Sequence, residues 1–145
     1  MTATTTVNPQ KSERVSNRRL LWVGPLAIVA AVAANFVVRA IALAVLSVPV
    51  DFLQLQSPSV VFFTVIGVLG AVIAFAIVGR RSRTPVRTYQ IVAGVVLLLS
   101  FLPDIGLLLA GAPGATLPGV LVLMLMHVVA AVVAVGILTR LAVQQ

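Results

Sequence analysis

The sequence predicts an all-α integral membrane protein, a four-helix bundle with its N and C termini in the cytoplasm. Of its 145 residues, 61% are apolar and only 9% are charged, whereas soluble domains are nearer half apolar and a quarter charged. The apolar residues form four runs, each long enough to cross a hydrocarbon layer about 30 Å thick. Nine of the ten Lys and Arg residues fall on the same side of these four predicted spans.

The segment RRSRTPVR, residues 80–87, sets the predicted orientation. It places four arginines between two long apolar halves of the chain. Arginine clusters in short loops stay on the cytoplasmic side of a membrane, so we place this loop in the cytoplasm. The net charge of +7 then reflects membrane topology and not a nucleic-acid-binding surface.

Residues 1–19 are polar and rich in Thr and Ser, which predicts a disordered cytoplasmic tail. Residues 20–48 are predicted to form the first helix, with Trp22 in the headgroup layer. A cleavable signal peptide ending near Ala33 is the competing interpretation. We favour an uncleaved helix, because the apolar run continues to Val48 and the apolar core of a signal peptide has only about 7–15 residues.

The second helix is predicted over residues 59–79, with Ser57 as its N-cap and Pro58 as its first residue. Small residues recur along it at a spacing of four and form two overlapping pairs, Gly67/Ala71 and Gly70/Ala74. Residues four apart share a helix face, and small side chains let a second helix approach closely. We therefore predict a helix-packing role for all four.

The third helix is predicted over residues 88–110, with Tyr89 at its cytoplasmic end as a counterpart of Trp22. Pro103 leaves two alternatives: the helix kinks there and continues, or it ends near Leu102. We favour the kinked helix, since a helix ending at Leu102 would be only about 22 Å long. The fourth helix is predicted over residues 118–139, and Arg140 marks its return to the cytoplasm.

Four polar residues fall inside the predicted spans, namely Asn35, Arg39, Asp104 and His127. At 1.5 Å per residue they lie roughly 20–28 Å from the cytoplasmic ends of their helices, and Thr64 lies roughly 24 Å in. A charge at the bilayer centre costs about 2.5–3.5 kcal/mol, which pairing Arg39 with Asp104 would reduce. We therefore predict one intramembrane polar cluster that faces the bundle interior and opens towards the outer side.

Structural alternatives exist for each charged or titratable member of this cluster. Arg39 can extend to the outer headgroups by itself. Asp104 is a loop residue if the third helix ends at Pro103. His127 can be a single polar residue that bridges two helices.

The sequence also lacks the residues that several kinds of chemistry require. With no cysteine and one histidine, it has no disulfide, thiolate metal site or iron–sulfur cluster, and no second histidine to ligate a haem. No metal ligand stands at a suitable spacing from His127, and no phosphate-binding loop or nucleophile elbow is present. We predict no enzymatic activity, no cofactor and no metal.

Several motifs together resemble a known family. They are WVGP followed by Asn35, the segment TPVRTYQIVAGVVLLLSFLPD that ends in Pro103 and Asp104, and MHVVAAVVAVGIL, which contains His127. This pattern is similar to the four-helix bacterial integral membrane proteins grouped as domain of unknown function 6069, over about Leu20 to Leu141. The resemblance implies the four-span fold and a membrane location, and it carries no known activity. The resemblance does not place Arg39.

The predicted function is that of a small accessory or interaction protein of the bacterial plasma (inner) membrane. Its expected partners are the lipid bilayer and either a second copy of the chain or a larger membrane protein. The alternative is a transporter or channel subunit whose outer-facing cavity is lined by Asn35, Arg39, Asp104 and His127. A lipid- or cofactor-binding protein is a third, weaker possibility.

Overall fold

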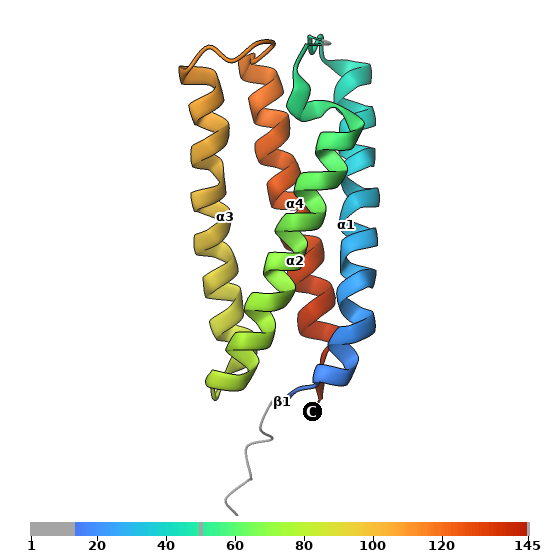
Figure 1. Cartoon of the computed structure of the whole chain (residues 1–145), viewed down its shortest axis with the longest axis vertical. Helices are drawn as coiled ribbons and strands as arrows, with labels where there is room; N and C mark the ends of the chain where they lie inside the picture. Colours follow the sequence, from blue (N-terminus) through green and yellow to red (C-terminus); the bar gives the residue numbers. More distant parts are fainter. Residues whose placement is uncertain (1–13, 50, 145) are drawn as a thin grey trace, which may run out of the picture.

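A computed structural model describes residues 14–49 and 51–144 of the chain. Its four long helices, α1 (Asn17–Val45), α2 (Ser57–Arg81), α3 (Pro85–Leu109) and α4 (Leu117–Leu141), stand side by side (Figure 1). A 3-10 helix, η1 (Leu53–Leu55), lies between α1 and α2. All four long helices are long and apolar enough to cross a membrane. The predicted all-α four-helix fold is therefore confirmed, and the chain is a multi-pass membrane protein.

The helices have two central and two outer positions in the bundle. Helix α1 packs against α4 and α2, and α3 also packs against α4 and α2. Figure 1 shows α1 and α3 on opposite edges, with α2 crossing obliquely between them and α4 behind it. Any contact between side chains of α1 and α3 must therefore reach past the central helices.

The closest packing follows a row of small residues on α1. Ala27 and Ala31 are fully buried against Val68 of α2 and Ala134 of α4. One turn earlier on α1, a methyl group placed on Gly24 would lie 3.4 Å from the side chain of a valine on α2. Small residues at spacings of three and four allow this approach of the backbones, so α1 carries the main small-residue face of the bundle.

The two ends of the described chain meet at one end of the bundle. Strand β1 (Arg14–Val15) pairs antiparallel with strand β2 (Val143–Gln144), and Ser16 N donates a hydrogen bond to Ala142 O at 3.0 Å. Gly79 makes room for this pair, because a Cβ placed on it would lie 2.5 Å from Val15 Cγ2. We refer to β1, β2 and these contacts as the terminal clip.

At the opposite end, the two helix connections pack against each other. Phe52, which precedes η1, is buried with 1% of its surface exposed. A Cβ on Gly114 would lie 2.6 Å from Phe52 N, and one on Gly119 would lie 3.0 Å from the Phe52 ring. Gly114 also has a φ of +72°, a conformation that glycine adopts without steric cost. These two glycines therefore let the α3–α4 connection close over Phe52.

Several local predictions differ from the structure. Residues 14–19 of the predicted disordered tail are ordered, as β1 and the start of α1, while residues 1–13 lie outside the described part of the chain. The N-cap of α2 is Gln56 and not Ser57. Helix α3 does continue through Pro103, as predicted, and the kink expected there stays a prediction.

Tyr89 also differs from its predicted place in the headgroup layer. It is 1% exposed and its ring meets that of Phe75 edge-on, with the centroids 4.7 Å apart. Trp22, by contrast, is 53% exposed. An aromatic residue near a helix end anchors at the interface only if its helix face is turned outward, and the face that carries Tyr89 is turned inward.

Candidate functional site

Asn35 joins α1 to α2 inside the bundle. It follows Ala31 by four residues, so it continues the buried small-residue face of α1, and it is 3% exposed. Its Nδ2 donates a hydrogen bond to Thr64 Oγ1 on α2 at 2.9 Å. Its Oδ1 accepts no hydrogen bond from the described residues. The Asn35 amide therefore links α1 to α2 through Nδ2, while its buried Oδ1 has no partner among the described residues.

Arg39 lies one turn beyond Asn35 on α1 and binds the connection between α1 and α2. Its Nε donates a hydrogen bond to Leu55 O at 2.6 Å, at the end of η1. Arg39 is half-buried, so it is not simply extended into the headgroups. The predicted pair with Asp104 is not formed, because Arg39 is on α1 and bonded to the connection while Asp104 is on α3, at the opposite edge of the bundle.

Asp104 pairs instead with His127 of α4. It is 5% exposed and lies inside α3, so it is not a loop residue that follows the helix. His127 Nδ1 lies 3.3 Å from Asp104 Oδ2, and this is the one ion pair that the structure records among residues 14–49 and 51–144. His127 thus bridges two helices, as one of the structural alternatives stated.

The same ring nitrogen of His127 also lies 2.8 Å from Leu123 O, one turn earlier on α4. A carbonyl oxygen accepts hydrogen bonds and cannot donate, so this contact requires a hydrogen on Nδ1. That hydrogen points towards Leu123, which leaves Asp104 Oδ2 near the ring without a well-aligned hydrogen bond among the described residues. The contact between Asp104 and His127 is therefore electrostatic in character.

The predicted cluster is thus arranged as two separate pairs and an anchor. Asn35 and Thr64 join α1 to α2, Asp104 and His127 join α3 to α4, and Arg39 holds η1. Whether any of these residues has a functional role stays a prediction. Among the described residues, no group of three or more His, Cys, Asp or Glu side chains could hold a metal ion.

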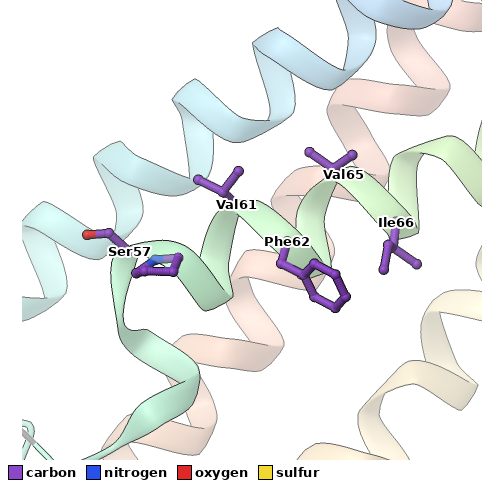
Figure 2. Close-up of a pocket in the computed structure, with 6 residues that line it drawn as sticks. Ser57, Val61, Phe62, Val65 and Ile66 are labelled. Atoms are coloured by element: carbon purple, nitrogen blue, oxygen red, sulfur yellow. The ribbon is translucent and has the colours of Figure 1, made fainter.

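Two hollows on the described part of the surface are apolar. The larger, of about 590 Å³, is formed by α2 residues Ser57, Pro58, Val61, Phe62, Val65 and Ile66. In Figure 2, Val61 and Val65 point to one side of α2, and Phe62 and Ile66 point to the other. The second, of about 360 Å³, is lined by Leu46, Leu117, Pro118, Leu121, Val122 and Leu125. Neither hollow is lined by a residue of the predicted polar cluster.

The predicted helix-packing residues of α2 have different surroundings. Ala71 and Ala74 pack inside the bundle, against the buried clusters that hold Ala27 and Phe75. Gly67 and Gly70 are exposed, and a Cβ on either one would meet nothing within 4 Å. Each predicted pair is therefore divided between the inside and the outside of the bundle.

Sequence reasoning missed some residues that organise this site. The small-residue face of α1 was visible as Gly24, Ala27 and Ala31 at helical spacing just before Asn35. The role of Gly79 had no signal, because it depends on a strand that was not predicted. The sequence carried no signal for the Leu123 carbonyl either, because a residue of any type four positions before His127 supplies a backbone carbonyl there.

No match was found among curated proteins or among solved structures. Residues 15–144, which include all four helices, match the family described as "Family of unknown function (DUF6069)". This range agrees with the resemblance that the motifs indicated over Leu20 to Leu141. The match covers well over half of the sequence and every residue of the two polar pairs, so the chain belongs to the DUF6069 family.

Proposed function

We propose that this protein is a non-enzymatic interaction protein of the bacterial plasma membrane, which associates with a second copy of itself through α2. The observation that carries this proposal is the open space at Gly67 and Gly70. Both glycines lie in the middle of a membrane-spanning helix, and their own bundle does not use them.

The exposed face of α2 has the shape that a crossing helix requires. Phe63 precedes Gly67 by four residues and Ile73 follows Gly70 by three, and both bulky side chains are exposed. The two glycines therefore form a shallow notch between larger side chains. In lipid, helices associate mainly through close packing, and small residues at the crossing point permit backbone contact.

A second copy fits this notch by symmetry. Two copies inserted with the same orientation are related by a two-fold axis along the membrane normal, which brings the same face of both α2 helices together. Gly67 and Gly70 lie roughly 16–21 Å from the Arg81 end of α2, close to the middle of a core about 30 Å thick. The helices would cross there, where both can approach without obstruction from loops.

The transporter alternative has less support. A transported ion or polar solute needs a polar path, and the two hollows described above are apolar. The polar side chains are tied into separate pairs on different helices. We therefore place the interaction function first.

The proposal is tested by Gly70→Leu. A Cβ at position 70 meets nothing within 4 Å in its own bundle, so the variant should fold, but its leucine side chain fills the notch. We expect chemical cross-linking of the protein in vesicles to give a dimer for the native chain, and at least a tenfold loss of that dimer for Gly70→Leu, which corresponds to about 1.4 kcal/mol.

Gly94→Leu is the matched control, because Gly94 is an exposed glycine on α3 that also has open space around it. It should dimerise like the native chain. A native chain that remains monomeric at high protein-to-lipid ratios, or a Gly70→Leu variant that dimerises normally, would contradict the proposal.

A further inference from the structure

We propose that Asp104 and His127 form a proton-binding site inside the membrane, with the bound proton on Nε2 of His127. The site goes beyond the proposed association through α2 and does not depend on it, since it lies between α3 and α4. Its ligand is a proton, which converts the histidine ring to an imidazolium and makes the pair neutral overall.

The first argument is the burial of the carboxyl group. The side chain of Asp104 is 8% exposed, and helices on both of its flanks cross the membrane. A carboxylate in such surroundings is strongly disfavoured unless a positive charge stands beside it. Pairing with an imidazolium keeps the carboxylate ionised without leaving a net charge in the hydrocarbon layer.

The second argument is that no other group can supply this charge. Helix α3 packs against α4 and α2. Between its ends, α2 carries no ionisable side chain before Arg80, and α4 carries only His127 before Arg140. On α3 itself, Arg87 and Tyr89 lie four turns or more away. Arg39, on α1, donates its Nε hydrogen to Leu55 O.

The third argument concerns which nitrogen takes the proton. Nδ1 must carry a hydrogen in either charge state, because it donates to Leu123 O. Because Nδ1 is already occupied, the ring can take a further hydrogen only at its other nitrogen. The additional proton therefore belongs on Nε2, and the N–H edge of the ring stays directed towards Leu123 and the carboxylate.

The two partners differ in how far they are covered by the bundle. The His127 side chain is 40% exposed, whereas that of Asp104 is only 8% exposed. The histidine is thus the member of the pair nearer the surface of the bundle, and the carboxylate lies behind it as the counter-charge. The histidine lies roughly 20 Å from the cytoplasmic end of its helix, so the pair is nearer to the outer surface.

The sequence makes a direct test simple, because it contains a single histidine. Nitrogen-15 NMR of histidine-labelled protein in vesicles reports the protonation of both ring nitrogens of His127. At pH 7 we expect the native chain to show hydrogens on both nitrogens. In Asp104→Asn we expect loss of the Nε2–H signal, with Nδ1–H retained.

Asp51→Asn is the control, because Asp51 is an exposed carboxylate in the α1–α2 connection, and this variant should give the native spectrum. A neutral His127 ring in the native chain at pH 7 overturns the proposal without any variant, so a failure of Asp104→Asn to fold does not obstruct the test. An imidazolium that persists in folded Asp104→Asn overturns it as well.

Discussion

A single buried hydrogen bond shows how polar side chains act in this bundle. Asn35 Nδ2 donates to Thr64 Oγ1 at 2.9 Å, between two helices whose other contacts at this level are apolar. In a membrane such a bond contributes little net free energy, about 0.6 kcal/mol on average, but an unsatisfied donor left behind costs more. The bond therefore matters most when only one partner is removed.

We predict that Thr64→Val lowers the free energy of unfolding in micelles by about 1 kcal/mol, because the isosteric valine leaves Asn35 Nδ2 without an acceptor. Thr139→Val is the control. Thr139 Oγ1 donates only to Val135 O in its own helix, so its loss should change stability by less than about 0.5 kcal/mol. Equal effects of the two substitutions, measured by reversible denaturation, would show that the bond between α1 and α2 has no special role.

At the residue scale, the sequence predicted the polar residues that connect helices. It was less successful in predicting which residue each of them contacts. Asn35, Asp104 and His127 are conspicuous because polar side chains are rare in spans, and all three do bridge helices. Their depths agree with one another, yet depth along an axis carries no information about direction around it. Arg39 was therefore paired with Asp104 on the basis of depth, although they belong to α1 and α3, which stand at opposite edges of the bundle.

Among the elements, the terminal clip depends on one glycine of α2. Any side chain at position 79 would occupy the space of Val15, whose Cγ2 would lie 2.5 Å from the new Cβ. Val15 itself packs against the buried cluster that contains Phe75 and Tyr89. Loss of this space therefore affects both the pairing of the strands and the packing beneath them.

We predict that Gly79→Ala releases the clip and costs about 1–3 kcal/mol of stability, a typical penalty for overpacking. Hydrogen–deuterium exchange should show faster exchange at Ser16 N, which bonds to Ala142 O in the native chain. Gly136→Ala is the control, since a Cβ there meets nothing within 4 Å and alanine favours a helix by up to about 1 kcal/mol. Unchanged exchange in Gly79→Ala would contradict this account.

The existence of the four helices was predictable, because each apolar run is long and bounded by charges, prolines or glycines. Their inward faces were much harder to predict. Helix α3, for example, exposes Val95, Leu98 and Leu102 to the surroundings, so its outer face is as apolar as a protein core. Where both faces of a helix are apolar, hydrophobic periodicity does not distinguish a face turned to lipid from one turned to neighbouring helices. For this reason the burial of Tyr89 inside the bundle was not predicted.

Over the whole molecule, charge is concentrated at one end. The terminal clip, the first turn of α1, the α2–α3 connection and the last turn of α4 share this end. They carry arginines from both halves of the chain, including Arg19, Arg83 and Arg140. The opposite end carries Asp51 and no Lys or Arg among the residues of its two connections. Basic residues near spans face the cytoplasm, so this distribution favours one orientation.

We predict that both ends of the chain lie in the cytoplasm. Fusions of a fluorescent protein to either end should fluoresce, and fusions of alkaline phosphatase to the same ends should be inactive, because that enzyme requires an oxidising compartment. A phosphatase inserted next to Gln54 in the α1–α2 connection is the control and should be active. Activity at one end alone would contradict the four-span arrangement, and activity at both ends would contradict the orientation.

The burial of Phe52 between the two helix connections has a consequence for how the chain is assembled. Phe52 is closely approached by Gly114 and Gly119, which belong to the second half of the sequence. Since α1, Phe52 and α2 precede those residues in the chain, Phe52 lacks these contacts until the second half has been synthesised. The burial of Phe52 is therefore completed only after α3 and the first turn of α4 have been made.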